Sequence, residues 1–327
     1  CLTTACVLVA ALGLAGTGTP RAQADTTDTQ RLMFQFQNTR LNNLVRHQPS
    51  LASFMSGAGS GALNADVSDH RGVLKFSSGF GGRLWARANG RWDTTGQRRA
   101  KYGFGAVGLH GLVTPNFIVG GIIEADYLSH AGTLSTRAGR GVMAGPYFLS
   151  RLASHPVYVE GRLLRGTASH RIWRSADGAR WPDTRRGLAQ LKLSGQLRYG
   201  ATTLTPRFLA SYATDDVSTG MADPFGGQGI RQHKIEMGLA FRHTLRRDNG
   251  ARIVVTGSGA FANTYTRRDG YDALAMPSLR DGRSRVNLGV SFMTNAGGAI
   301  AIDSFLGGIG RYAPRTYGLK AGYNIRF

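Results

Sequence analysis

The chain has 327 residues, of which 46 are glycine, 10 are proline and only 18% are charged, so it carries too few charges for a disordered protein. Its longest apolar run, Ala5–Ala15, is shorter than the roughly 20 residues of a transmembrane helix, which excludes a helical membrane protein but leaves a membrane β-barrel open. The net charge is +21, mostly from arginine, but no basic helix or RNA-binding motif is present, and we expect no nucleic acid partner.

Residues 1–24 are predicted to form a secretory signal peptide. Ala5–Ala15 has the length of its apolar region, and Ala22 and Ala24 supply an Ala-x-Ala cleavage site before Asp25. A buried N-terminal helix is the alternative. Both cysteines of the chain lie in this segment, so the processed chain would form no disulfide and no thiolate metal site.

Residues 25–70 are predicted to form a helical segment and a linker. Apolar residues recur at helical spacing from Leu32 to Val45, and the other positions are mostly Gln, Asn and Arg. Gln48-Pro49 should end or kink this helix, with a second short turn over Leu51–Met55. Gly57–Gly61 is interpreted as a flexible break.

Residues 71–327 are predicted to contain only β-strands, about twelve of them. The clearest alternation is over 188–199, where Leu191, Leu193, Leu197 and Tyr199 alternate with polar residues. The predicted strands are 82–92, 99–113, 116–129, 140–153, 156–167, 188–199, 202–213, 234–246, 251–265, 285–295, 298–307 and 314–327.

The connections between these strands alternate in length. Short turns such as Thr114–Asn116 and Gly200-Ala201 are separated by long loops at 168–186, 214–231 and 266–283. Long strands, aromatic residues near their ends and this alternation are typical of an outer-membrane barrel. A soluble barrel would also alternate, but it could not bury the charged face cheaply. The predicted fold is therefore all-β, an antiparallel transmembrane β-barrel of about 12 strands with the helix in its lumen.

A barrel of about twelve strands is wider than side chains alone can fill. We expect the polar helix to fill it and to meet charged side chains of the wall. The expected plug residues are Arg40, Asn42, Asn43 and Arg46, and the expected wall residues are Glu124, Glu160, Lys192, Arg198 and Glu236.

From about residue 30 to the end, the chain resembles the autotransporter β-domain, the translocator of type V secretion. The resemblance rests on the polar helix, the twelve strands, Gly145-Pro146-Tyr147, Tyr158–Leu163, Leu204–Phe208 and the Tyr-x-Ile-Arg-Phe ending.

This resemblance implies insertion in the outer membrane of a Gram-negative bacterium and export of an N-terminal passenger. It also implies that Tyr323, Ile325 and Phe327 form a signal read by the barrel-assembly machinery. Expected partners are outer-membrane lipid and lipopolysaccharide, whose phosphates suit the excess arginine, and we expect a monomer. The segment between Ala24 and the first predicted strand is too short for a stacked β-helix passenger, so a passive pore is the alternative.

No catalytic, cofactor-binding or metal-ligating residue is predicted, so we do not expect an enzyme. Ser169-His170 and similar pairs are adjacent in sequence and point to opposite faces of a strand, and their histidines are interpreted as interfacial or loop residues. Asn42-Asn43 is interpreted as a pair that hydrogen-bonds the wall. The alternative is self-cleavage between them, assisted by Glu124, Glu160 or Glu236.

Overall fold

The computed structural model describes residues 20–56, 62–68, 71–80, 83–95, 98–132, 135–152, 156–174, 178–218, 227–270, 279–293, 299–309 and 316–324. Helix α1 spans Pro20–His47 and a single turn, α2, spans Ser53–Ser56. The helix thus ends directly before Gln48-Pro49, as predicted, because the residue before a proline disfavours the helical conformation. Its first five residues fall inside the predicted signal peptide; residues 1–19 lie outside the described part of the chain, and the signal peptide stays a prediction.

The other described elements are strands. The first eight are β1 (Ala62–Ser68), β2 (Arg71–Phe80), β3 (Leu84–Thr95), β4 (Arg98–Thr114), β5 (Phe117–Ala131), β6 (Ser135–Arg151), β7 (Val157–Arg174) and β8 (Gly178–Arg180). The last eight are β9 (Asp183–Gly195), β10 (Leu197–Tyr199), β11 (Thr202–Val217), β12 (Gly229–Arg246), β13 (Arg252–Asp269), β14 (Leu279–Met293), β15 (Ala299–Ile309) and β16 (Thr316–Asn324).

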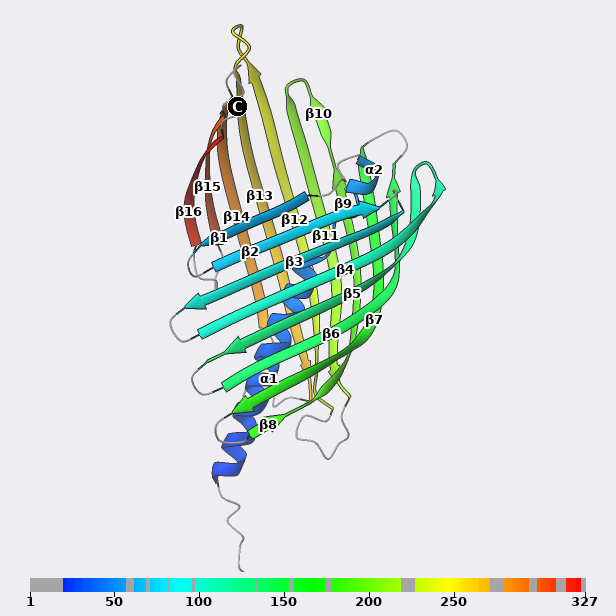
Figure 1. Ribbon diagram of the computed structural model, residues 1–327, viewed down its shortest axis with the longest axis vertical. Coiled ribbons are helices and arrows are strands. Elements are labelled where there is room, and N and C mark those ends of the chain that lie inside the picture. Colours follow the sequence, from blue (N-terminus) through cyan, green and yellow to red (C-terminus); the bar gives the residue numbers. More distant parts are fainter. Residues whose placement is uncertain are drawn as a thin grey trace, which may run out of the picture.

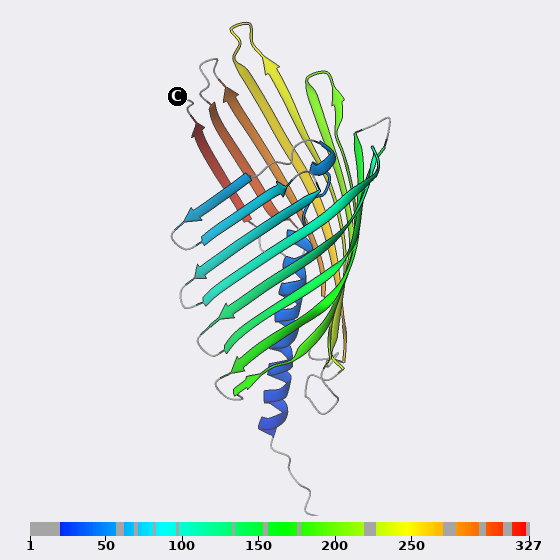
Figure 2. The same ribbon diagram turned by 45° about the vertical axis from the view of Figure 1, so that its right-hand side comes forward.

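All described strands belong to one antiparallel sheet in which neighbours in sequence are neighbours in space (Figure 1). Two short strands lie off the main path: β8 extends β7 and β10 extends β11. The sheet is strongly curved, and both views show α1 running along its concave side (Figures 1 and 2). Among the described strands, no pairing joins β1 to β16, so the sheet is open where we predicted a closed barrel. These end strands have only 7 and 9 residues and offer few backbone groups for closure.

The predicted strand count was too low. All twelve predicted strands are present, but the hairpin β1–β2 precedes them, in a region partly interpreted as linker. Leu63, Ala65 and Val67 alternate with Asn64, Asp66 and Ser68, but β1 has only 7 residues, fewer than the roughly 9–11 expected of a strand that crosses a bilayer.

Three loops were predicted too long. Strand β7 continues to Arg174 and β9 begins at Asp183, so most of 168–186 is paired backbone, and the predicted loops at 214–231 and 266–283 shorten in the same way. These strand ends are polar on both faces, which hides the alternation while backbone pairing continues. The turn at Pro115-Asn116 and the turn at Gly200-Ala201 are short, as predicted.

Apolar side chains lie on the outer face of the sheet and polar side chains on its inner face, the reverse of the arrangement in a soluble protein. The convex face carries exposed apolar side chains on every long strand, including Leu109 (60% exposed), Ile123 (59%), Leu163 (59%), Met237 (54%) and Leu288 (56%). The concave face buries polar and charged side chains together with most of the α1 surface. No helix among the described residues is both long enough and apolar enough to cross a bilayer.

Candidate functional site: a helix held inside the sheet

Helix α1 presents most of its circumference to the concave face. Met33, Phe36, Gln37, Arg40 and Leu41 are fully buried, whereas the stripe containing Arg31, Gln35, Asn42 and Arg46 is exposed. The apolar members pack against inner residues of the sheet, and Phe36 meets the rings of His130 and His170 edge-on, at centroid distances of 6.1 and 5.7 Å. A helix with this pattern is stabilised by the wall around it rather than by its own propensity.

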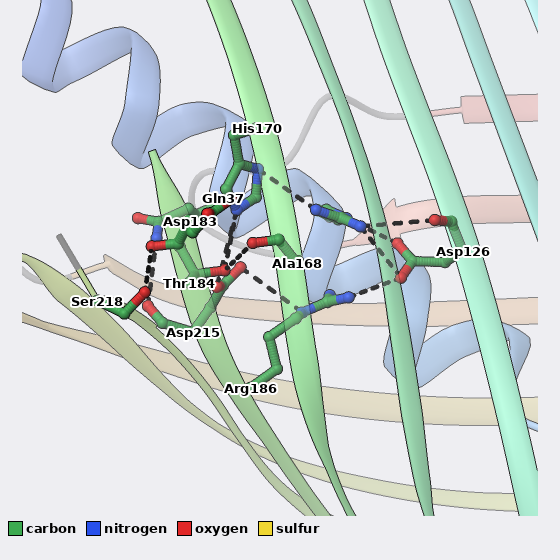
Figure 3. A network of polar contacts seen from close by, with 10 residues as sticks. Gln37, Asp126, Ala168, His170, Asp183, Thr184, Arg186, Asp215 and Ser218 are labelled. Carbon is green, nitrogen blue, oxygen red and sulfur yellow. Dashed lines mark hydrogen bonds and ion pairs between the residues drawn. The ribbon is translucent and has the colours of Figure 1, made fainter. Parts of the chain in front are cut away.

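The C-terminal half of the helix is held by a buried charge cluster, which we call the Asp126 cluster: Arg40, Asp126, His170, Arg186 and Asp215. Arg40 donates from Nε to Asp126 Oδ2 at 2.7 Å and from Nη2 to Oδ1 at 3.3 Å, and Arg186 Nη1 donates to Oδ1 at 2.6 Å. The cluster joins α1 to β5, β7, β9 and β11 (Figure 3).

The other members complete the cluster around these two arginines. Arg40 Nη1 lies 3.3 Å from His170 Nδ1, and His170 Nε2 lies 3.1 Å from Thr184 Oγ1. If Arg40 donates to Nδ1, then Nε2 carries the proton and donates to Thr184, which is the neutral tautomer of the ring. Asp215 Oδ2 lies 3.7 Å from Arg186 Nε, and Gln37 donates to the Asp215 backbone carbonyl at 3.2 Å.

Two glycines of β6 make room for the Arg40 guanidinium. A Cβ atom at Gly139 would lie 2.8 Å from Arg40 Nη1, and one at Gly141 would lie 2.8 Å from Arg40 Nη2. Any larger residue would push the guanidinium away from Asp126. The local sequence of β6 is therefore fitted to an arginine that comes from a distant part of the chain.

A second cluster, the linker cluster, holds the segment that follows α1. Gln48 donates to Glu124 at 2.7 Å and accepts from Arg162 Nη1 at 2.7 Å, and Arg162 Nη2 also donates to the Pro49 carbonyl. Glu160 accepts from the Leu51 backbone N–H and pairs with Lys192 at 2.6 Å, while Lys192 also donates to Ser50 at 2.8 Å.

Helix α2 is packed against an aromatic group at the short-turn end of the sheet. The ring of Phe54 lies 5.4 Å from Trp85 and 4.9 Å from His110. Trp85 Nε1 donates to the Tyr147 hydroxyl at 2.8 Å, and His110 Nδ1 lies 2.7 Å from the same oxygen. The chain is thus held at three levels, from Arg40 in the C-terminal half of α1 to α2.

Four of the sequence-predicted residues lie in these clusters: Arg40, Glu124, Glu160 and Lys192. The others do not. Asn42 and Arg46 belong to the exposed stripe, and Asn42 Nδ2 bonds to the Asn38 carbonyl of its own helix at 2.9 Å. The Asn43 side chain is half-buried, and its carbonyl oxygen lies 2.8 Å from His47 Nδ1.

The remaining two wall residues lie apart from the clusters. Arg198 is exposed on β10, in register with Thr203, beyond the end of the helix contacts. Glu236 faces the interior from β12 and pairs with Lys234 of its own strand at 2.8 Å. Of the insertion signal, Tyr323 lies on β16 in register with Ile300, while Ile325 and Phe327 lie outside the described residues.

Sequence reasoning missed much of the Asp126 cluster, and its interpretation of His170 was wrong. His170 is 1% exposed and faces α1, while Ser169 faces outward, so the adjacent pair is split between faces as predicted. His170, Arg186 and Asp215 all fall in segments that were interpreted as loops. On β7 and β9 the even-numbered residues face the interior. Extending this alternation into the segments interpreted as loops would have placed His170 and Arg186 on the inner face, and it is the signal that could have found them.

No protein-family model matches the chain, and no curated protein matches it. Among solved structures, the chain is similar to the β-domain of the Bordetella autotransporter BrkA, with 15% identity and a TM-score of 0.48, over 75% of this chain and 99% of that one. It is also similar to the translocator domain of the autotransporter NalP from Neisseria meningitidis, with 15% identity and a TM-score of 0.45, over 92% of this chain and 98% of that one.

A third similar structure is BauA, the ferric preacinetobactin receptor of Acinetobacter baumannii, with 11% identity and a TM-score of 0.45, over 82% of this chain and 53% of that one. At such identities these are similarities of overall shape. The class that the chain's own features define is an antiparallel sheet with an apolar convex face, wrapped around a helix held by buried ion pairs.

Proposed function

We propose that this chain is the outer-membrane translocator of an autotransporter-type protein, whose strands cross the membrane and whose helix α1 occupies the interior. The apolar convex face supports the membrane location. On β12, the outward residues between His233 and His243 include Ile235, Met237 and Leu239, each about half exposed. At about 3.4 Å per residue and a tilt of about 40°, that stretch projects to about 26 Å, close to the roughly 25 Å apolar band of such barrels.

The observation that carries the proposal is the direction in which α1 runs through the sheet. In the first half of α1, Thr29 accepts a hydrogen bond from Arg174, at the end of β7 where the long connections gather. Its end and the linker cluster lie near the start of β7, at the end with the short turns. Long connections face the outside of the cell in outer-membrane barrels, so the chain that precedes α1 would leave at the cell surface.

The orientation is tested by labelling intact cells with a membrane-impermeant maleimide, with Cys1 and Cys6 replaced by Ser. Arg180→Cys, on the exposed β8, should react on intact cells. Asp248→Cys, in the short turn after β12, should react only after the outer membrane is opened. The reverse pattern would contradict the proposed orientation.

Lipid, lipopolysaccharide and the barrel-assembly machinery are the partners we propose for this role, with a monomeric chain. A passive pore is the competing function, and the helix held at three levels argues against an open channel. For self-cleavage at Asn42-Asn43, all three candidate acids bond elsewhere: Glu124 to Gln48, Glu160 to Lys192 and Glu236 to Lys234. An Asn43→Asp variant should therefore migrate like the wild type on a denaturing gel.

A further inference from the structure

The convex face carries an ordered row of rings near the long-connection end. Tyr212, His233, Tyr265 and Arg280 are direct cross-strand neighbours on β11, β12, β13 and β14. The ring centroids are 4.8 Å apart for Tyr212 and His233 and 6.4 Å apart for His233 and Tyr265, and the Arg280 guanidinium lies 5.5 Å from the Tyr265 ring centre. Amphipathic rings of this kind mark the boundary between hydrocarbon and headgroups.

The next outward-facing row of cross-strand neighbours, two residues closer to the long connections, has an arginine at each end. Arg165, Gly187, Thr214 and Arg231 are cross-strand neighbours on β7, β9, β11 and β12, and Arg185 lies one row beyond Gly187. Arg165 and Arg185 are exposed. Arg231 is 43% exposed and pairs with Asp269 at 3.1 Å, a carboxylate that Arg267 also approaches.

The two residues between Arg165 and Arg231 are small. With about 4.8 Å between strands, these arginines start roughly 14 Å apart, and a flexible guanidinium can reach inward from either side over Gly187 and Thr214. Asp216 faces the same side, and with Asp269 it gives two carboxylates against Arg165, Arg185, Arg231 and Arg267. This part of the convex face therefore keeps an excess of positive charge toward the long-connection end of the sheet.

Directly below this row, the convex face is hollowed by an apolar groove of about 800 Å³. Small residues form its floor, among them Gly161, Ala189 and Ala210, and its upper end is bounded by Tyr212 and His233. The pairing of β6 with β7 is interrupted beside it, since the register passes from Ala144↔Arg165 to Tyr147↔Arg162 without Gly145 and Pro146. Proline has no N–H to donate to the ladder.

We propose that this surface binds one molecule of lipopolysaccharide through its lipid A moiety, with an acyl chain in the groove and the phosphates on Arg165, Arg185 and Arg231. Bidentate, charge-assisted bonds from arginine suit phosphate, and three separated guanidinium groups suit a lipid with more than one phosphate better than a phospholipid with a single one. The inference rests on the proposed function, because only the orientation proposed above puts this end in the lipopolysaccharide leaflet.

The test is binding of bis-phosphorylated lipid A to the detergent-solubilised full chain, followed by native mass spectrometry. We compare the wild type with Arg165→Gln/Arg185→Gln/Arg231→Gln. The matched control is Arg246→Gln/Arg247→Gln/Arg252→Gln, which removes three exposed arginines at the short-turn end. Ala210→Phe fills the groove without changing charge.

We expect at least a tenfold loss of lipid A affinity in the first triple variant and almost none in the control. Lipid A stripped of phosphate should bind the wild type as weakly as lipid A binds the triple variant, and Ala210→Phe should weaken binding of intact lipid A severalfold. Unchanged binding in the triple variant, an equal loss in the control, or equally tight binding of phosphatidylglycerol would each overturn the proposal. Binding in detergent does not depend on orientation, so its failure and the failure of the labelling experiment are distinguishable.

Discussion

The wall formed by β5–β11 and the wall formed by β14–β16 differ in how they contact the helix. The first buries its inner polar residues and pairs them with α1 and the linker, as Asp126, Glu160 and Arg162 show. The second carries partly exposed polar residues such as Asp281, Arg283 and Arg285 on its inner face, which pair with one another or remain open to the interior. Between these walls, Gln232 of β12 and Thr266 of β13 donate hydrogen bonds to Asn38 of α1, and the Arg268 guanidinium of β13 lies 5.4 Å from the Phe34 ring centre. Among the described residues, the helix is therefore anchored mainly to β5–β13 rather than held evenly by the whole sheet.

The substitution Arg40→Met should have the largest effect on this difference between the two walls. It leaves Asp126 and Asp215 buried with Arg186 as their remaining arginine, and loss of one partner of a buried pair costs about 3–5 kcal/mol. We expect α1 to become accessible to protease in the folded protein and the unfolding temperature to fall. Arg283→Met is the control, because its partner Asp281 lies at a half-exposed surface and such pairs contribute about 1 kcal/mol or less. Equal effects of the two variants would contradict an anchored wall.

Gly141→Leu should have the next largest effect. Its side chain would occupy the space of the Arg40 and Arg186 guanidinium groups, and overpacking of this kind costs about 1–3 kcal/mol. Gly103→Ala on the outer face of β4 is the control, since nothing lies within 4 Å of its added Cβ. Thermal unfolding in detergent measures both, and a stable Gly141→Leu protein with protected α1 would count against the fit described for β6.

Much of this wall could be predicted from sequence, but its ion pairs could not. Strict alternation over 188–199 and 234–246 predicted these two strands, because their outward-facing residues are apolar and their inward-facing residues are polar. Arg186 and Asp215 lie beyond that apolar zone, where both faces are polar and period two disappears. No sequence pattern shows which arginine meets which aspartate, since Arg40 and Asp126 are 86 residues apart and meet only through the curvature of the sheet.

The hairpin β1–β2 shows a different limit at the other end of the sheet. Its pairing is fully regular, from Ala62↔Ser77 to Ser68↔Arg71, and Leu63, Ala65 and Val67 alternate with polar residues. Strand β1 has only 7 residues, fewer than the roughly 9–11 of a strand that crosses a bilayer, so its length hid it. Backbone pairing with β2, which itself pairs with β3, stabilises it.

Glu160→Gln should destabilise the protein less and tests the contacts that the wall makes with the linker after α1. The neutral amide keeps the shape but has only one acceptor oxygen, so it can keep the bond to Lys192 or to the Leu51 N–H but not both, and a charge-assisted bond of this kind contributes about 1.5–3 kcal/mol. We expect brief openings of a bilayer channel without loss of the fold. Glu236→Gln, whose partner Lys234 lies on the same strand, should leave the channel closed.

Phe54→Ala should have the smallest effect of the four. It removes the contacts of α2 with Trp85 and His110 but leaves both buried clusters intact. Aromatic pairs contribute about 0.5–1.5 kcal/mol beyond their buried area, so we expect a shift of a few degrees in the unfolding temperature. A larger loss than that of Gly141→Leu would mean that α2, and not the Asp126 cluster, is the main anchor.

The most direct test is single-channel conductance in planar bilayers, with the full chain compared with one lacking residues 28–56. If α1 and its linker occupy the interior, the full chain stays closed and the deletion variant conducts strongly. Equal conductance of the two chains would contradict a helix held inside the sheet.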